Sequence, residues 1–186
     1  MTEPAAGQAG RHGPFLAVLH WLVALAAAGQ VWLGWWMLSL PKAPPGLRAD
    51  WFNVHKSIGL TIGLVMLLRI IVRLREPRLP YPASMPGWQQ TAAHASHGLL
   101  YVLLLALPLT GYLGSSFTRY PIKYFGYALP HWGWEAPALK ELMSLIHLSC
   151  VWALMALVTL HVAAALKHLL VERDGMFQRI WPFGGR

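Results

Sequence analysis

The stretch from Leu142 to Leu170, LMSLIHLSCVWALMALVTLHVAAALKHLL, decides the fold of this chain. It is apolar over more than the ~20 residues that a helix needs to cross a bilayer. It also contains His147, His161 and His168, separated by steps of 14 and 7 residues. Because a helix turns by ~100° per residue, both steps return close to the same face. We therefore predict a membrane-spanning helix with one stripe of histidines.

His147 and His161 are predicted to lie at opposite depths of the membrane. At ~1.5 Å rise per residue their separation is ~21 Å, within a hydrocarbon core of ~30 Å. An imidazole at such a depth is costly unless it is satisfied, so it is a candidate functional group. Neutral imidazole commonly binds metals and haem iron. The alternatives are a plain hydrogen bond between helices and zinc, which requires three or four clustered ligands.

The composition indicates an integral membrane protein. Of the 186 residues 56% are hydrophobic and 12% are charged, with a mean hydropathy of +0.44. The net charge of +8 does not indicate nucleic-acid binding, because the basic residues cluster between apolar runs and no nucleic-acid motif is present. Cys150 is the sole cysteine, which excludes an intrachain disulfide and covalent haem attachment through C-x-x-C-H.

Three further apolar runs precede the first-quoted stretch, at residues 14–40, 53–74 and 91–116. The fold class is therefore an all-α membrane protein, an up-down-up-down bundle of four transmembrane helices. We expect a polar N-terminal tail, one bundle domain and a cytoplasmic C-terminal tail, at residues 1–13, 14–171 and 172–186. The aromatic loop at 117–140 is long for a turn between neighbouring helices, and such loops are usually functional.

Lys and Arg counts predict that both termini are cytoplasmic. With the N-terminus inside, the inner segments hold nine basic residues and the outer segments six. The compact inner group of Arg69, Arg73, Arg75 and Arg78 carries most of this bias.

When successive spans cross the membrane in alternating directions, each histidine is assigned to a depth in the membrane. His20 and His161 fall in an inner layer, and His55 and His147 in an outer layer. Bis-histidine ligation in each layer would give two low-spin b haems suited to electron transfer. Three more histidines lie at the inner face and could replace His20 or handle protons: His94, His97 and His168. His12 and His131 are expected to be plain surface residues.

Several short motifs then show a family resemblance. They are His20-Trp21-Leu22-Val23, Asn53-Val54-His55-Lys56, Ala93-His94-Ala95-Ser96-His97, Ala106-Leu107-Pro108 and Leu160-His161-Val162-Ala163-Ala164-Ala165. In this order they resemble the bacterial cytochrome b561 family over nearly the whole chain. The resemblance implies a compact dihaem, quinone-reactive protein of the bacterial inner membrane, with His20, His55, His147 and His161 as haem ligands. It also places His97 and His168 at a quinone pocket near the inner haem.

The resemblance implies an enzyme, a superoxide:ubiquinone oxidoreductase. Superoxide would reduce the outer haem, and electrons would pass to the inner haem and then to ubiquinone. Four cations would attract the superoxide anion, or merely anchor the loops at the interface: Lys42, Lys56, Arg119 and Lys123. The alternative function is a cytochrome b anchor that passes electrons between quinone and a partner dehydrogenase or periplasmic carrier. A third reading is a haem-binding sensor or structural membrane protein.

Overall fold

The computed structural model of this protein describes residues 10–42, 46–77 and 79–182. Its long helices are α1 Pro14–Ser39, α2 Leu47–Arg75, α3 Gly87–Ser116 and α4 Pro137–Lys167. Within the described residues, these four are long and apolar enough to cross a membrane. The predicted all-α membrane bundle is confirmed. Arg78 and most of the predicted N-terminal tail lie outside the described residues.

Prolines and a glycine place the helix ends. Pro14 and Pro137 occupy the first turns of α1 and α4, where the missing N–H costs nothing. Gly46 precedes α2 with φ of 119°, a conformation that other residues rarely adopt. Pro108 lies inside α3, and a Cβ on Gly63 of α2 would approach its ring to 3.0 Å. α2 and α3 therefore pack closely at the point where Pro108 interrupts the helical hydrogen bonds.

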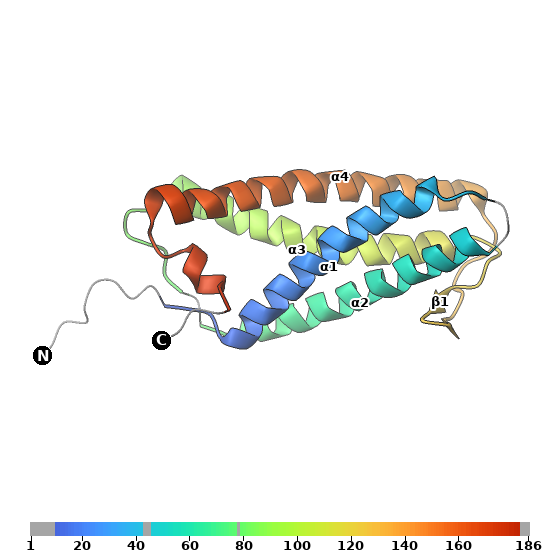
Figure 1. The fold of residues 1–186 in the computed structure, drawn as a ribbon, viewed down its shortest axis with the longest axis horizontal. Helices are drawn as coiled ribbons and strands as arrows, with labels where there is room; N and C mark the ends of the chain where they lie inside the picture. The colour runs from blue at the N-terminus through green and yellow to red at the C-terminus, as the bar shows by residue number, and fades with distance from the viewer. Residues whose placement is uncertain (1–9, 43–45, 78, 183–186) are drawn as a thin grey trace, which may run out of the picture.

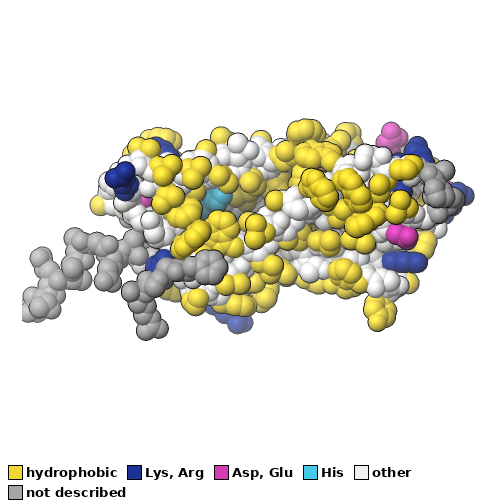
Figure 2. Space-filling model, viewed as in Figure 1, with side chains coloured by type: hydrophobic (Ala, Val, Ile, Leu, Met, Phe, Trp, Pro, Cys, Tyr) yellow, Lys and Arg dark blue, Asp and Glu magenta, His cyan; other side chains and the backbone are white. Residues whose placement is uncertain are grey.

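The helices pack in chain order, α1 on α2, α2 on α3 and α3 on α4 (Figure 1). Val23, Ile62 and Met66 form one buried cluster between α1 and α2. A second cluster lies between α3 and α4 and contains Leu100, Leu103 and Leu154. Hydrophobic side chains cover most of the face in Figure 2, and the charged side chains gather toward the two ends. This is the surface expected of helices that face lipid.

At one end of the bundle, which we call the hairpin end, the loop before α4 forms a short β-hairpin. β1 Lys123–Tyr124 pairs antiparallel with β2 Tyr127–Ala128, and Phe125 and Gly126 turn with φ of 46° and 95°. The fully buried Ser57 of α2 holds this turn. Its hydroxyl donates to the Asn53 carbonyl at 2.7 Å, lies 3.3 Å from the Lys123 carbonyl and accepts from the Phe125 N–H at 2.9 Å.

At the opposite end, which we call the terminal end, the chain folds back on α1. α4 continues into the π-helical turn η1 His168–Glu172, and the 3₁₀ turn η2 Phe177–Ile180 follows. The Trp21 indole donates to the Ile180 carbonyl at 3.1 Å, and the backbone N–H of His12 donates to the Arg179 carbonyl at 3.1 Å. Part of the predicted C-terminal tail is therefore packed against the bundle.

The expectation that His12 is a plain surface residue was wrong. Its side chain is 16% exposed, and its Nδ1 lies 3.0 Å from Oε2 of Glu76 at the end of α2. The other oxygen of the same carboxylate accepts from the Gly13 N–H at 3.1 Å. Burial lowers the pKa of His12, although the Glu76 hydrogen bond opposes this shift. The start of α1 is thus fastened to the end of α2.

Candidate functional site

At the hairpin end, His55 of α2 and His147 of α4 face each other across the bundle. Their ring centroids are 6.4 Å apart. Metal–nitrogen bonds of ~2 Å, with each nitrogen ~1.1 Å from its ring centre, put two imidazoles on one iron ~6 Å apart. The observed separation therefore fits two ligands of a single metal.

The contacts of His147 leave one ring nitrogen for such a bond. Its Nδ1 lies 3.1 Å from the Leu107 carbonyl and 3.1 Å from the Thr110 hydroxyl, both on α3. A carbonyl only accepts, so Nδ1 carries the proton and Nε2 keeps its lone pair. This is the arrangement that usually orients a ligating histidine.

The neighbourhood of His55 contains unsatisfied polar atoms. Its Nδ1 is buried and has no hydrogen-bond partner among the residues that the structure describes. The same holds for Oε1 of Gln30, whose amide nitrogen donates to the His55 carbonyl. A Cβ on Gly34 would lie 3.3 Å from the His55 ring, and one on Gly111 3.5 Å from the His147 ring. Glycine keeps side chains off both imidazoles.

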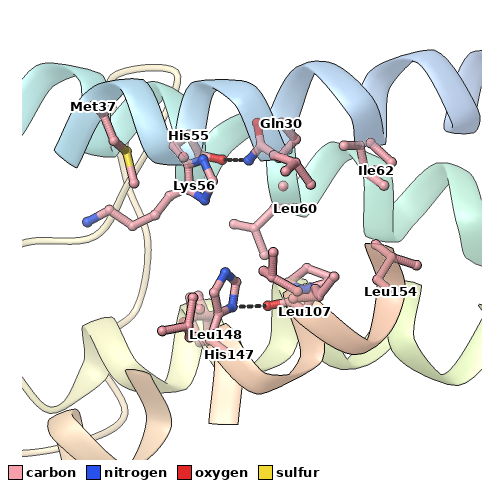
Figure 3. A pocket seen from close by; sticks show the side chains of 18 of the residues that line it. Gln30, Met37, His55, Lys56, Leu60, Ile62, Leu107, His147, Leu148 and Leu154 are labelled. Carbon is pink, nitrogen blue, oxygen red and sulfur yellow. Dashed lines mark hydrogen bonds between the residues drawn. The ribbon is translucent and has the colours of Figure 1, made fainter. Parts of the chain in front are cut away.

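A cavity of about 180 Å³ lies between these two histidines. Figure 3 shows His55 and His147 pointing into it from opposite sides, with Leu60, Leu107 and other apolar side chains around them. The Lys56 side chain runs along one edge. An apolar cavity with an imidazole on each side fits a haem b held without covalent attachment.

At the terminal end, three histidines from different helices meet. The ring centroids of His20 on α1 and His161 on α4 are 6.3 Å apart, again the separation that fits two ligands of one iron. His97 of α3 lies nearer, 5.2 Å from the His161 ring, and stands edge-on to it. The structure thus brings together both predicted pairs and sets His97 beside the inner one.

Arg69 of α2 belongs to the same group, and sequence reasoning missed this role. One guanidinium nitrogen lies 3.1 Å from His20 Nδ1, and the guanidinium carbon lies 5.2 Å from the centre of the Tyr101 ring. At the level of sequence, Arg69 was used only as one of four basic residues that predict the orientation of the chain in the membrane. The available signal was its position six residues before the end of α2, inside the apolar span.

His168 is held between two carboxylates at the terminal end. Its Nδ1 lies 2.6 Å from Glu172 Oε2 and 2.7 Å from Asp174 Oδ2. The ligand atoms of these three residues lie within 4.8 Å of one another, as a metal site requires. Lys167 pairs with Glu172 at 2.7 Å, so ion pairs already satisfy this carboxylate. The arrangement suits the transfer of protons between an imidazole and carboxylates.

Two other histidines have simpler contacts. His94 is exposed and stands edge-on to the Tyr81 ring, with centroids 5.3 Å apart. His131 is exposed in the loop before α4, where its ring contacts the Gly133 carbonyl.

The four predicted superoxide-attracting cations do not form one cluster. Lys56 lines the cavity at the hairpin end, whereas Lys42, Arg119 and Lys123 are exposed and do not line it. Arg119 lines a separate, open cleft with Tyr120, His131 and Glu135. Its hydrogen bond to the Tyr120 hydroxyl raises the pKa of Arg119. Only Lys56 is in position to touch a group within the cavity.

A membrane-spanning four-helix bundle with paired histidines at two depths defines a class of protein, the membrane-bound b-type cytochromes. Comparison with known families agrees. The model of the family described as "Prokaryotic cytochrome b561" matches residues 11–183, and the chain belongs to this family. It is therefore a multi-pass bacterial membrane protein that binds haem b and transfers electrons.

Curated relatives match along nearly their whole length. "Cytochrome b561 homolog 2" of Escherichia coli K12 is 31% identical, over 91% of this chain and 90% of the relative. "Probable superoxide oxidase CybB" of Yersinia pestis is 29% identical, over 88% of this chain and 92% of the relative. "Cytochrome b561 homolog 1" of Escherichia coli K12 is 28% identical, over 88% and 93%.

Proposed function

We propose that this protein oxidises superoxide at the hairpin end and reduces ubiquinone at the terminal end. Two superoxide anions each give up one electron and become dioxygen. One ubiquinone takes the two electrons with two protons and becomes ubiquinol. The observation that carries the proposal is the pair of facing imidazoles in each layer, 6.4 Å and 6.3 Å apart. The similarity to a relative named as a probable superoxide oxidase supports the choice of substrate.

Four histidines would hold two b haems in this protein. His55 and His147 bind one at the hairpin end, and His20 and His161 bind the other at the terminal end. When bound, the haems would supply one-electron transfer, and the four histidines would hold them. The Leu107 carbonyl holds the proton of His147 on Nδ1, and the glycines opposite the hairpin-end pair keep side chains off the imidazoles.

The hairpin end faces the periplasm in this proposal, and both termini face the cytoplasm. The fold gathers Arg73, Arg75, Lys167, Arg173 and Arg179 near the terminal end, because these residues lie at the end of α2 and beyond α4. Cytoplasmic segments of membrane proteins are enriched in such residues. Superoxide formed outside the cell membrane would thus meet the hairpin end.

Cations at the hairpin end would draw the superoxide anion toward the cavity. Lys56 contributes the charge at the cavity edge, while Lys42, Arg119 and Lys123 act from the surface. Charged surfaces of this kind raise the association rate of small ions of opposite sign.

Protons for ubiquinone would come from the terminal end. His97 stands edge-on to His161, and we assign His97 to the quinone site at the inner layer. His168, with Glu172 and Asp174, forms a chain of titratable groups beyond α4 that can collect protons from water.

The proposal is tested with purified protein, a steady source of superoxide and a soluble ubiquinone. We expect catalytic superoxide consumption with one quinol formed for every two superoxide anions oxidised. A protein that accepts electrons from quinol but consumes no superoxide would instead support the cytochrome b anchor, whose exposed loop aromatics would face a partner: Tyr120, Phe125, Tyr127, Trp132 and Trp134.

A further inference from the structure

Arg69 places a positive charge inside the apolar span of α2. Its Nη2 donates to His20 Nδ1 at 3.1 Å, and the guanidinium lies over the Tyr101 ring. Its Nε is buried and has no hydrogen-bond partner in the described part of the chain. The ion pairs found among the described residues do not include it. Arg69 as a whole is half-buried, and a cation inside an apolar span is costly unless an anion compensates its charge.

The hydrogen bond to His20 also restricts the chemistry of that imidazole. A guanidinium only donates, so Nδ1 accepts, and a neutral imidazole then carries its proton on Nε2. A histidine that binds iron through Nε2 carries its proton on Nδ1 instead. A neutral His20 therefore cannot accept the Arg69 hydrogen bond at Nδ1 and bind iron through Nε2 at the same time. When His20 serves as a ligand, Arg69 must donate to a different acceptor.

The depth of Arg69 suits an acceptor on the porphyrin itself. His20 lies six residues after the start of α1, and Arg69 six residues before the end of α2. At ~1.5 Å per residue both lie ~9 Å from the same end of the bundle. Haem b carries two propionate carboxylates, whereas ubiquinone is neutral. A guanidinium pairs with a carboxylate through two parallel hydrogen bonds, the strongest geometry open to it.

We propose that Arg69 binds a propionate carboxylate of the haem held by His20 and His161. This inference rests on the haem ligation proposed above. In this arrangement Arg69 releases His20 Nδ1, gains the anion that its charge requires and fixes the porphyrin in its plane. Its charge near the iron stabilises the reduced, less positive form. Arg69 therefore favours reduction of the haem at the terminal end, next to the proposed quinone site.

The test compares three variants as holoproteins. Arg69→Gln removes the charge, and Arg69→Lys keeps it without the planar fork. Arg75→Gln removes the same charge from the same helix at an exposed position and is the matched control. Resonance Raman spectra report the propionate bending modes, and a redox titration of quinone-free protein reports each haem potential.

In Arg69→Gln we expect the propionate bands of one haem to shift. The reduction equilibrium of the same haem should become at least tenfold less favourable, which is 59 mV for one electron. Arg69→Lys should recover part of the potential, and Arg75→Gln should match the wild type in both measurements. Should Arg69→Gln lose one haem, retention of that haem in Arg69→Lys supports the proposal.

Wild-type propionate bands in Arg69→Gln, with both haems present, would overturn this inference whatever the potentials. Loss of the same haem in both Arg69 variants would also overturn it, because the cation would then not be what holds the porphyrin. A wild-type protein without a haem at His20 and His161 would be a failure of the proposed ligation instead, and haem quantification shows this before any variant is made.

Discussion

Single side chains set the ligating atoms at the hairpin end. His147 has its Nδ1 fixed by two groups on α3, the Leu107 carbonyl and the Thr110 hydroxyl. His55 has no equivalent partner among the described residues. The two ligands of one proposed haem are thus held by different means, and we expect them to respond differently to substitution.

Replacement of His147 by Ala should remove the haem at the hairpin end and leave the other in place. His161→Ala should do the reverse, because each residue contributes to one layer only. Haem quantification and the reduced-minus-oxidised spectrum of each purified variant measure this. If both variants kept two haems per chain, the pairing would be wrong.

Thr110→Val should weaken the orientation of His147 while the Leu107 carbonyl still holds its proton. Partners of metal-ligating histidines typically change metal affinity by ~10- to 100-fold when they are removed. We expect faster loss of the hairpin-end haem to a haem acceptor. Thr159→Val, an exposed threonine on α4, is the control. Equal haem loss from wild type and Thr110→Val would show that the carbonyl alone is sufficient.

Among the elements, the β-hairpin depends on one buried hydroxyl of α2. Ser57→Ala leaves the Phe125 N–H without its acceptor, and an unsatisfied group of this kind costs about 1–3 kcal/mol. We expect faster amide hydrogen exchange across β1 and β2 with unchanged exchange in α4. Unchanged hairpin exchange would mean that the strand pairing holds the turn without Ser57.

The junction between the start of α1 and the end of α2 should be sensitive to pH. The pKa of His12 is lowered from 6.5 in the folded protein, so the unfolded segment binds more protons than the folded one. Because burial of the ring causes this shift, the stability contributed by packing the neutral His12 ring is present above pH 6.5 and is lost as the pH falls through the folded pKa, although the Glu76 hydrogen bond opposes the loss. Hydrogen exchange near residues 12–17 should accelerate as the pH is lowered, after correction for the intrinsic rate, and His12→Gln should remove the extra acceleration.

The spacing of residues was sufficient to predict the helices and which histidines lie at the same depth. Both depend on positions along a helix and on the alternating direction of successive spans. The position of a histidine within its apolar span predicts its depth in the membrane, and this holds for His20, His55, His147 and His161. The partners of these histidines depend on rotation and side-chain direction, which spacing does not determine. Arg69, Thr110 and the Leu107 carbonyl were therefore missed. His12 was misjudged because its partner, Glu76, lies on another helix.

At the scale of the whole molecule, the distribution of cations should govern the encounter with superoxide. The Debye length shrinks from ~30 Å at 0.01 M salt to ~10 Å at 0.1 M, so attraction by exposed charges should fade across this range. The double variant Arg119→Gln, Lys123→Gln should react more slowly at low salt and show a flatter salt dependence. A neutral electron donor serves as the control. A variant with the wild-type rate and slope would mean that these two residues only anchor the loop.

The central claim is that one chain holds two b haems, each between two histidines, at opposite depths of the membrane. Haem quantification of the purified wild-type protein by its pyridine adduct, together with its electron paramagnetic resonance spectrum, tests this most directly. We expect two haem b per chain and two low-spin ferric signals, since each iron has both axial positions filled by imidazole. A single haem per chain, or a high-spin signal from one of two haems, would contradict the claim.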